Sequence, residues 1–221
     1  MEKVKKIFMV LFRIILICCL IMAINFLYVL NYIPHRKYTN EDFGIETFIS
    51  SVDKDGDGID DQSDMLQSVK DYLATKPKYQ SKYYGTGYPD DEYGVCTDVV
   101  AFGMLNAGYD LMSLVYDDVW ANREMYDIEI VDINIDFRRV QNLQVFFKNN
   151  FISLTTDIYD IESWQPGDIV IFERHIGVIS EYRNKKGIPF VYHNGNPYQA
   201  DYLEDILEYY DNIIGHYRLS Q

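Results

Sequence analysis

The most prominent hydrophobic pattern is an almost uninterrupted apolar run over residues 7–30, preceded by Lys3, Lys5 and Lys6. A run of this length can span a bilayer as one helix. No clear small-residue cleavage site follows it, as a signal peptide would require. We therefore expect residues 1–30 to be an uncleaved, single-pass membrane anchor. The lysines place its N-terminus in the cytoplasm and the remaining chain outside, by the positive-inside rule.

A polar linker over residues 31–46 is followed by three segments with helical periodicity. The first lies within 47–76 and begins near Asp64, and Pro77 ends it. The second covers 99–107, where Gly108 suits a left-handed helix end. The third follows residue 140. Their apolar faces carry Leu66, Val69 and Leu73; Val99, Val100, Met104 and Leu105; and Leu143, Phe146 and Phe147.

From Trp164 onward the pattern changes to alternation with short turns. Four strands are predicted, and helices followed by an antiparallel meander indicate an α+β fold in which residues 77–221 form the main domain. Residues 110–136 are polar and have no clear assignment. The predicted strands cover 168–172, 175–182, 188–194 and 214–219.

The charge and the cysteine content of the chain limit the partners and the chemistry to be considered. The chain of 221 residues has a net charge of −14, and residues 1–37 hold six of its 20 Lys and Arg but only one acid, so the remainder is more acidic still. An acidic exported domain repels nucleic acid, so no nucleic-acid partner is expected, whereas cations would be attracted. Of the three cysteines, Cys18 and Cys19 lie in the apolar run. Cys96 is thus the one thiol of the folded part and has no disulfide partner within it.

An acidic loop precedes the first predicted helix of the folded part. Acids occupy relative positions 1, 3, 5, 9 and 12, and Gly56 occupies position 6, as in calcium loops of dockerins and thrombospondin type 3 repeats. We expect a structural Ca²⁺; the alternative is an acidic surface turn without a metal. The expected ligands are Asp53, Asp55, Asp57, the Ile59 carbonyl, Asp61 and Asp64.

Cys96 directly precedes the second predicted helix. The unpaired N–H groups and the positive dipole end at a helix start favour a thiolate, so we expect a lowered Cys96 pKa. A buried structural cysteine is the alternative.

A nucleophilic cysteine needs a nearby base whose ring is held by a third group. His175 and His193 are the candidates, because they lie on consecutive predicted strands. If the connecting loop covers residues 183–187, His193 lies opposite Gly177 and on the same face as His175. The alternative is that one or both are ordinary strand residues. His216 has no clear partner.

Arg138 and Arg139 are unusual in so acidic a domain. They could bind a substrate carboxylate. They could equally be structural and pair with Asp136 or Asp98, and the sequence leaves both readings open.

Several motifs in order resemble a known group. The segments 165–172 (QPGDIVIF) and 175–178 (HIGV), after a helix-starting cysteine, resemble NlpC-type cell-wall peptidases of the papain-like superfamily. The motifs at 94–98 (GVCTD), 135–140 (IDFRRV), 167–170 (GDIV) and 215–218 (GHYR) resemble more closely an uncharacterised bacterial "domain of unknown function" family assigned to that amidase fold.

The resemblance implies that Cys96 is the nucleophile, His175 the base and His193 the orienting residue, while Tyr84 assists the oxyanion site. Thr97 and Asp98 stand where Ser-Gly is typical. A carboxylate there would raise the thiol pKa unless an arginine pairs with it.

The expected function is a membrane-anchored extracytoplasmic cysteine amidase or peptidase acting on peptidoglycan stem peptides. One alternative is a calcium-stabilised cell-surface module that binds without chemistry. A second is an enzyme with the same site that transfers acyl groups to an amine.

Overall fold

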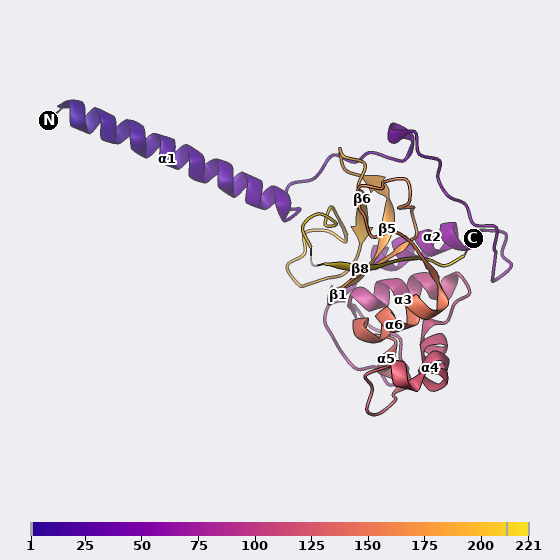
Figure 1. Cartoon of the computed structure of the whole chain (residues 1–221). Helices are drawn as coiled ribbons and strands as arrows, with labels where there is room; N and C mark the ends of the chain where they lie inside the picture. The colour runs from indigo at the N-terminus through magenta and orange to yellow at the C-terminus, as the bar shows by residue number, and fades with distance from the viewer. Residues whose placement is uncertain (1, 211, 221) are drawn as a thin grey trace. The chain divides into compact units, whose positions relative to one another are not determined.

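A computed structural model describes residues 2–210 and 212–220. The chain separates into two compact units, one ending at His35 and the other beginning at Arg36. The first consists mainly of α1 (Glu2–Val29), which is fully exposed and is long and apolar enough to cross a membrane (Figure 1). An N-terminal apolar helix of this kind is consistent with an anchor or a signal peptide.

The helices of the second unit follow the sequence patterns closely. α2 (Asp61–Ala74) begins earlier than expected, because the Asp60 side chain accepts hydrogen bonds from the backbone N–H groups of Gln62 and Ser63. α3 (Cys96–Asn106) ends before Gly108, whose φ of 80° is left-handed. The third predicted helix, expected after residue 140, is α6 (Val140–Asn150).

The region without a sequence assignment is also helical. It contains α4 (Leu111–Ala121), the 3₁₀ helix η2 (Arg123–Met125) and the short α5 (Ile133–Asp136). A further 3₁₀ helix, η1 (Glu41–Phe43), lies in the expected linker. Part of that linker belongs to the second unit, because Tyr38 pairs with Arg183 through backbone hydrogen bonds of 2.9 and 2.8 Å.

The sheet has six antiparallel strands in the order β3-β8-β4-β5-β6-β7. β8 therefore lies between β3 and β4, instead of extending a sequential meander. The strands are β3 (Ile152–Ser153), β4 (Ile169–Phe172), β5 (Ile176–Arg183), β6 (Pro189–Tyr192), β7 (Leu203–Glu204) and β8 (Ile213–Arg218); separately, β1 (Lys78–Tyr79) pairs with β2 (Tyr93–Gly94).

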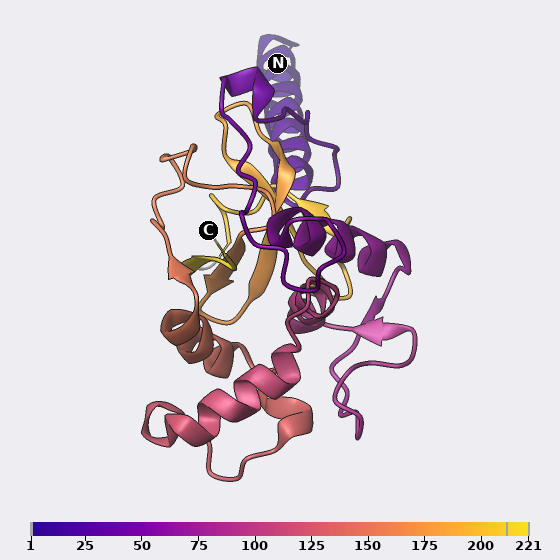
Figure 2. The same cartoon turned by 90° about the vertical axis from the view of Figure 1, so that its right-hand side faces the viewer.

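Alternation along β4 explains how the sheet separates two apolar clusters. Ile169 and Ile171 face the larger cluster, which includes the buried faces of α2, α3, α4 and α6. Val170 and Phe172 face a smaller cluster around Trp164 on the opposite side. Helices α3 to α6 accordingly gather on one side of the sheet (Figures 1 and 2). The fold is a mixed α+β arrangement in which α3 packs against β5.

Candidate active site

Cys96 is the first residue of α3, and the preceding Val95 is extended. Its sulfur accepts a hydrogen bond from the backbone N–H of Ile176, the residue that follows His175 on β5. The backbone N–H groups of Thr97 and Cys96 also face the sulfur. The packing of α3 on β5 therefore brings the thiol to the start of the strand that His175 directly precedes.

The expected low pKa of this thiol is not what the structure supports. Burial raises the Cys96 pKa to about 11, and the Asp98 carboxylate adds to the rise. The surrounding N–H groups act in the opposite direction but do not outweigh burial. The sequence indicated that Cys96 lies at a helix start, but not how deeply its sulfur is buried. Because the pKa is raised to about 11, the resting form of Cys96 is a thiol.

His175 and His193 are in direct contact. His175 Nε2 lies 3.0 Å from His193 Nδ1, and the rings are nearly perpendicular at 83°. Both residues are buried. Burial, and then the neighbouring His193, lower the His175 pKa well below its ordinary value, so His175 is neutral near pH 7.

Strand register explains the contact. Val178 pairs with Tyr192 and Ile179 with Val191, which places His193 opposite Gly177 as predicted. A Cβ on Gly177 would lie 3.4 Å from the His193 Cβ. The predicted loop of residues 183–187 lies one residue too early, because Arg183 pairs with Pro189 and the connection covers residues 184–188. An irregularity within β5 shifts the register by an even number of residues, so the rings remain on one face.

Two polar side chains behind the histidines, one acceptor and one donor, were not found from the sequence. His193 Nε2 lies 3.2 Å from Glu204 Oε2, and Glu204 is 7% exposed. The Gln199 side chain hydrogen-bonds the His193 carbonyl at 3.0 Å. β7, which carries Glu204, is too short to produce an alternating pattern, so no local signal could have identified this residue.

A cavity of about 530 Å³ borders His175. Its lining includes Arg174 together with Tyr209 and Tyr210, and the Tyr210 ring centroid lies 4.8 Å from that of His175. Arg174 lines this cavity, whereas the sequence had offered Arg138 and Arg139 as candidates for binding a substrate carboxylate.

The two adjacent arginines have different environments. Arg138 forms a buried bidentate pair with Asp98, with N–O distances of 2.6 and 2.9 Å, and its side chain is 2% exposed. It also donates to the Lys82 carbonyl. This location suits the structural reading and not the substrate-binding role. Arg139 is half-exposed, 4.0 Å from Asp136, and its role stays a prediction.

Tyr84 lies close to Arg138 but its hydroxyl is directed elsewhere. The ring lies 4.9 Å from the Arg138 guanidinium. The hydroxyl donates to Asp91 Oδ1 at 2.8 Å, and burial together with that carboxylate raises the Tyr84 pKa to about 12. Since the hydroxyl hydrogen is directed to Asp91, an oxyanion role for Tyr84 would require that bond to break.

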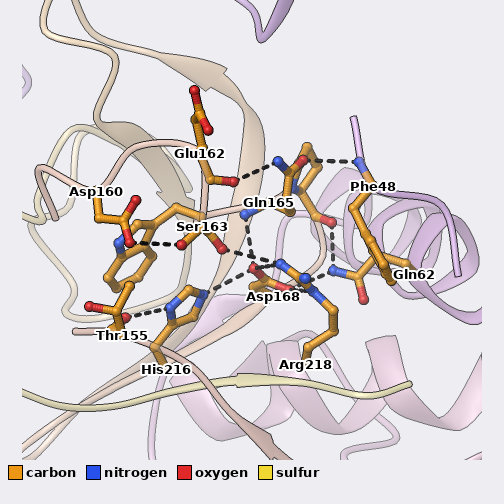
Figure 3. Close-up of polar contacts among 12 residues, drawn as sticks. Phe48, Gln62, Thr155, Asp160, Glu162, Ser163, Gln165, Asp168, His216 and Arg218 are labelled. Carbon is orange, nitrogen blue, oxygen red and sulfur yellow. Dashed lines mark hydrogen bonds and ion pairs between the residues drawn. The ribbon is translucent and has the colours of Figure 1, made fainter. Parts of the chain in front are cut away.

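The GDIV and GHYR motifs meet in a buried polar cluster around Asp168 (Figure 3). Asp168 accepts from both Nε and Nη2 of Arg218 at 2.7 Å and from His216 Nε2 at 3.0 Å. His216 also donates from Nδ1 to the Thr155 carbonyl and stacks on Trp164 at 3.8 Å. His216 therefore has a partner that the sequence did not reveal, and the cluster joins β4 to β8.

In the acidic loop, ligand oxygens of Asp53, Asp55 and Asp57 all lie within 4.8 Å of one another. Asp61 is directed inward instead: it accepts from the Lys54 N–H and from the Tyr109 hydroxyl. Burial raises the Asp64 pKa to about 6, and the neighbouring carboxylates, Asp57 first, add to the rise. The converging hard oxygens suit Ca²⁺, although the inward Asp61 reduces the expected ligand set.

Comparisons with known proteins identify a family and no activity. Residues 66–219 match the model of a domain of unknown function, DUF1287. The chain is also similar to the Escherichia coli (strain K12) protein named "Uncharacterized protein YijF", with 33% identity over 161 residues that cover 69% of this chain and 77% of that protein. No solved structure matches. The family match spans α3 to α6, the sheet and the histidine pair, and the chain belongs to the DUF1287 family.

Proposed function

We propose that this protein is a membrane-anchored, extracytoplasmic cysteine amidase or peptidase with a papain-like arrangement, acting on peptidoglycan stem peptides. The observation that carries the proposal is the meeting of α3 and β5. Cys96 at the helix start accepts a hydrogen bond from the residue after His175, and His193 holds the His175 ring. Nucleophile, base and orienting group are the three parts that thiol acyl transfer requires.

Cys96 rests as a thiol and His175 as a neutral ring, so proton transfer accompanies the attack. When His175 donates its Nε2 hydrogen to His193 Nδ1, its own Nδ1 has a free lone pair. Nδ1 takes the Cys96 proton as the sulfur forms a bond to the substrate carbonyl carbon. The backbone N–H groups at the start of α3 stabilise the oxyanion.

The second half of the reaction returns the site to its first state. The protonated His175 gives its proton to the amide nitrogen as the carbon–nitrogen bond breaks, which leaves a thioester on Cys96. His175 then removes a proton from water, the hydroxide oxygen bonds to the thioester carbon, and Cys96 leaves as a thiol after taking the proton back.

The proposed substrate and location have separate support. The apolar α1 is long enough to hold the domain at a membrane. The cavity beside His175 places one cation, Arg174, next to the base in a chain of net charge −14. A guanidinium there suits a substrate that carries a carboxylate. Asp53, Asp55 and Asp57 would hold a structural Ca²⁺, which stiffens the loop before α2 and takes no part in the reaction.

One observation favours the rival, a calcium-stabilised surface module without catalysis. Burial raises the Cys96 pKa to about 11, as in an inert structural thiol. The enzyme and the binding module predict different effects of the substitution Cys96→Ala. In the enzyme this substitution abolishes turnover and leaves wall binding intact.

The decisive experiment is digestion of purified muropeptides with the wild-type chain and with Cys96→Ala. We expect new amino and carboxyl termini from the wild type alone, detected by mass spectrometry. Adding a primary amine separates hydrolysis from acyl transfer, because transfer yields the amide of that amine. Equal products from both proteins, or none from either, would reject the proposed hydrolase.

A further inference from the structure

We infer that Glu204 is a positioning residue that fixes the tautomers of His193 and His175. The inference rests on the proposed function, because it assigns the residue behind the base of the same site. Glu204 lies on β7, and its Oε2 is 3.2 Å from His193 Nε2. It acts through His193 and does not touch the reacting atoms.

The Glu204 carboxylate is held at both oxygens. Oε1 accepts from the backbone N–H groups of Ala200 and Asp201 at 3.1 and 3.4 Å. Oε2 faces His193 Nε2, and the Glu204 side chain is 9% exposed. Because a carboxylate can only accept, Nε2 of His193 must carry a hydrogen.

A neighbouring amide does not reverse this assignment. Gln199 Nε2 lies 3.4 Å from His193 Nε2. Its two hydrogens already have closer acceptors, the carbonyls of His193 at 3.0 Å and Asp201 at 2.5 Å. The amide therefore has no further hydrogen to donate to the ring.

The hydrogen on His193 Nε2 then fixes the donor and the acceptor in the hydrogen bond between His193 and His175. With its hydrogen on Nε2, His193 offers a lone pair at Nδ1, which accepts the Nε2 hydrogen of His175 across 3.0 Å. This leaves the Nδ1 lone pair of His175 to receive the thiol proton. If His193 carried its hydrogen on Nδ1, His175 would become the acceptor at Nε2 and its Nδ1 would be protonated, which would disable the base.

Glu204→Gln tests the chain of tautomers with almost no change in shape. The two backbone N–H groups at Ala200 and Asp201 require an acceptor, so the amide oxygen will occupy the Oε1 position. The amide NH₂ then faces His193 Nε2 and donates to it. We expect His193 to change to the Nδ1–H form and His175 to change with it.

The measurement is long-range ¹H–¹⁵N NMR of the histidine rings in the full chain in detergent micelles. The expected wild-type forms are Nε2–H for His193 and for His175. Glu204→Gln should convert both to Nδ1–H. Glu181→Gln is the control, because Glu181 bonds Lys70 and the Tyr192 hydroxyl on the same sheet without touching a histidine.

A kinetic readout separates this inference from the proposed hydrolysis. General-base catalysis contributes about 10²–10⁴-fold, and we expect Glu204→Gln to lower kcat by about that factor with KM retained. A chain that shows the tautomer change but cleaves no muropeptide supports the Glu204 inference and rejects the enzyme. An Nδ1–H form of His193 in the wild type overturns the inference even if the variant does not fold, as does an unchanged tautomer in a folded Glu204→Gln.

Discussion

The buried pair of Arg138 and Asp98 provides a sharp test, because Arg139 is a matched control next to it in the chain. Arg138→Met removes the guanidinium and leaves the fully buried Asp98 carboxylate without its bidentate partner. Breaking a buried ion pair from one side costs about 3–5 kcal/mol, because the remaining charge is uncompensated. The backbone N–H of Val95 still donates to Asp98, so we expect the lower part of this range.

Arg139→Met removes the same charge from a side chain that is 51% exposed, and whose carboxylate partner is at the limit of an ion pair at 4.0 Å. Such pairs contribute about 0–1 kcal/mol. For a domain of this size, 1 kcal/mol shifts Tm by about 2–4 °C. With the lower part of the 3–5 kcal/mol range, the expected losses are roughly 6–16 °C for Arg138→Met and under about 4 °C for Arg139→Met.

The assay is urea and thermal unfolding of the two variants, followed by circular dichroism. The double variant Asp98→Asn/Arg138→Met should recover part of the lost stability, because it removes the charge that was left unpaired. Equal and small losses for both arginines would refute the reasoning. That result would favour the other reading that the sequence left open for Arg138, binding of a substrate carboxylate.

Three further outcomes follow from the structure. Burial and then His193 lower the His175 pKa, so the base stays unprotonated to lower pH. The acid limb of the pH profile of kcat/KM should therefore lie below pH 6.5, and an acid limb at or above pH 6.5 would contradict this. Asp64 has a pKa of about 6, so protons compete with Ca²⁺ below that pH. Ca²⁺ should thus raise Tm more at pH 7.5 than at pH 5, and Asp55→Asn should reduce this increase in Tm. A Ca²⁺-dependent increase in Tm that is the same at both pH values would show that Asp64 takes no part in binding. Gly177→Ala puts a Cβ 2.4 Å from Val191 Cγ1 and should lower the free energy of unfolding by about 1–3 kcal/mol, measured by urea unfolding. An unchanged urea midpoint would contradict the close packing of β5 on β6.

Local periodicity was enough to predict much of the fold. The apolar spacing predicted α3 and α6, and alternation predicted β4, β5, β6 and β8 within one or two residues. The parity of the β5–β6 pairing also brought His193 opposite Gly177, because side chains alternate faces and the register shift within β5 is an even number of residues. These features depend on backbone geometry that is the same in every helix and strand.

The position of β8 beside β4, the inward turn of Asp61 and the partner of His216 required the tertiary structure. Each depends on segments far apart in the chain that meet only after folding. Glu204 is the clearest case, since a two-residue strand has no period to detect.

The sequence by itself determined which residues can do chemistry and on which elements they lie. It placed one thiol at a helix start and two histidines on consecutive strands. Only the tertiary structure decided their charge and orientation. Burial reversed the expected shift of the Cys96 pKa, and Asp98 took Arg138 as its partner. The physical reason is that desolvation and ion pairing depend on what packs around a group, whereas periodicity records only which side of its own element the group occupies.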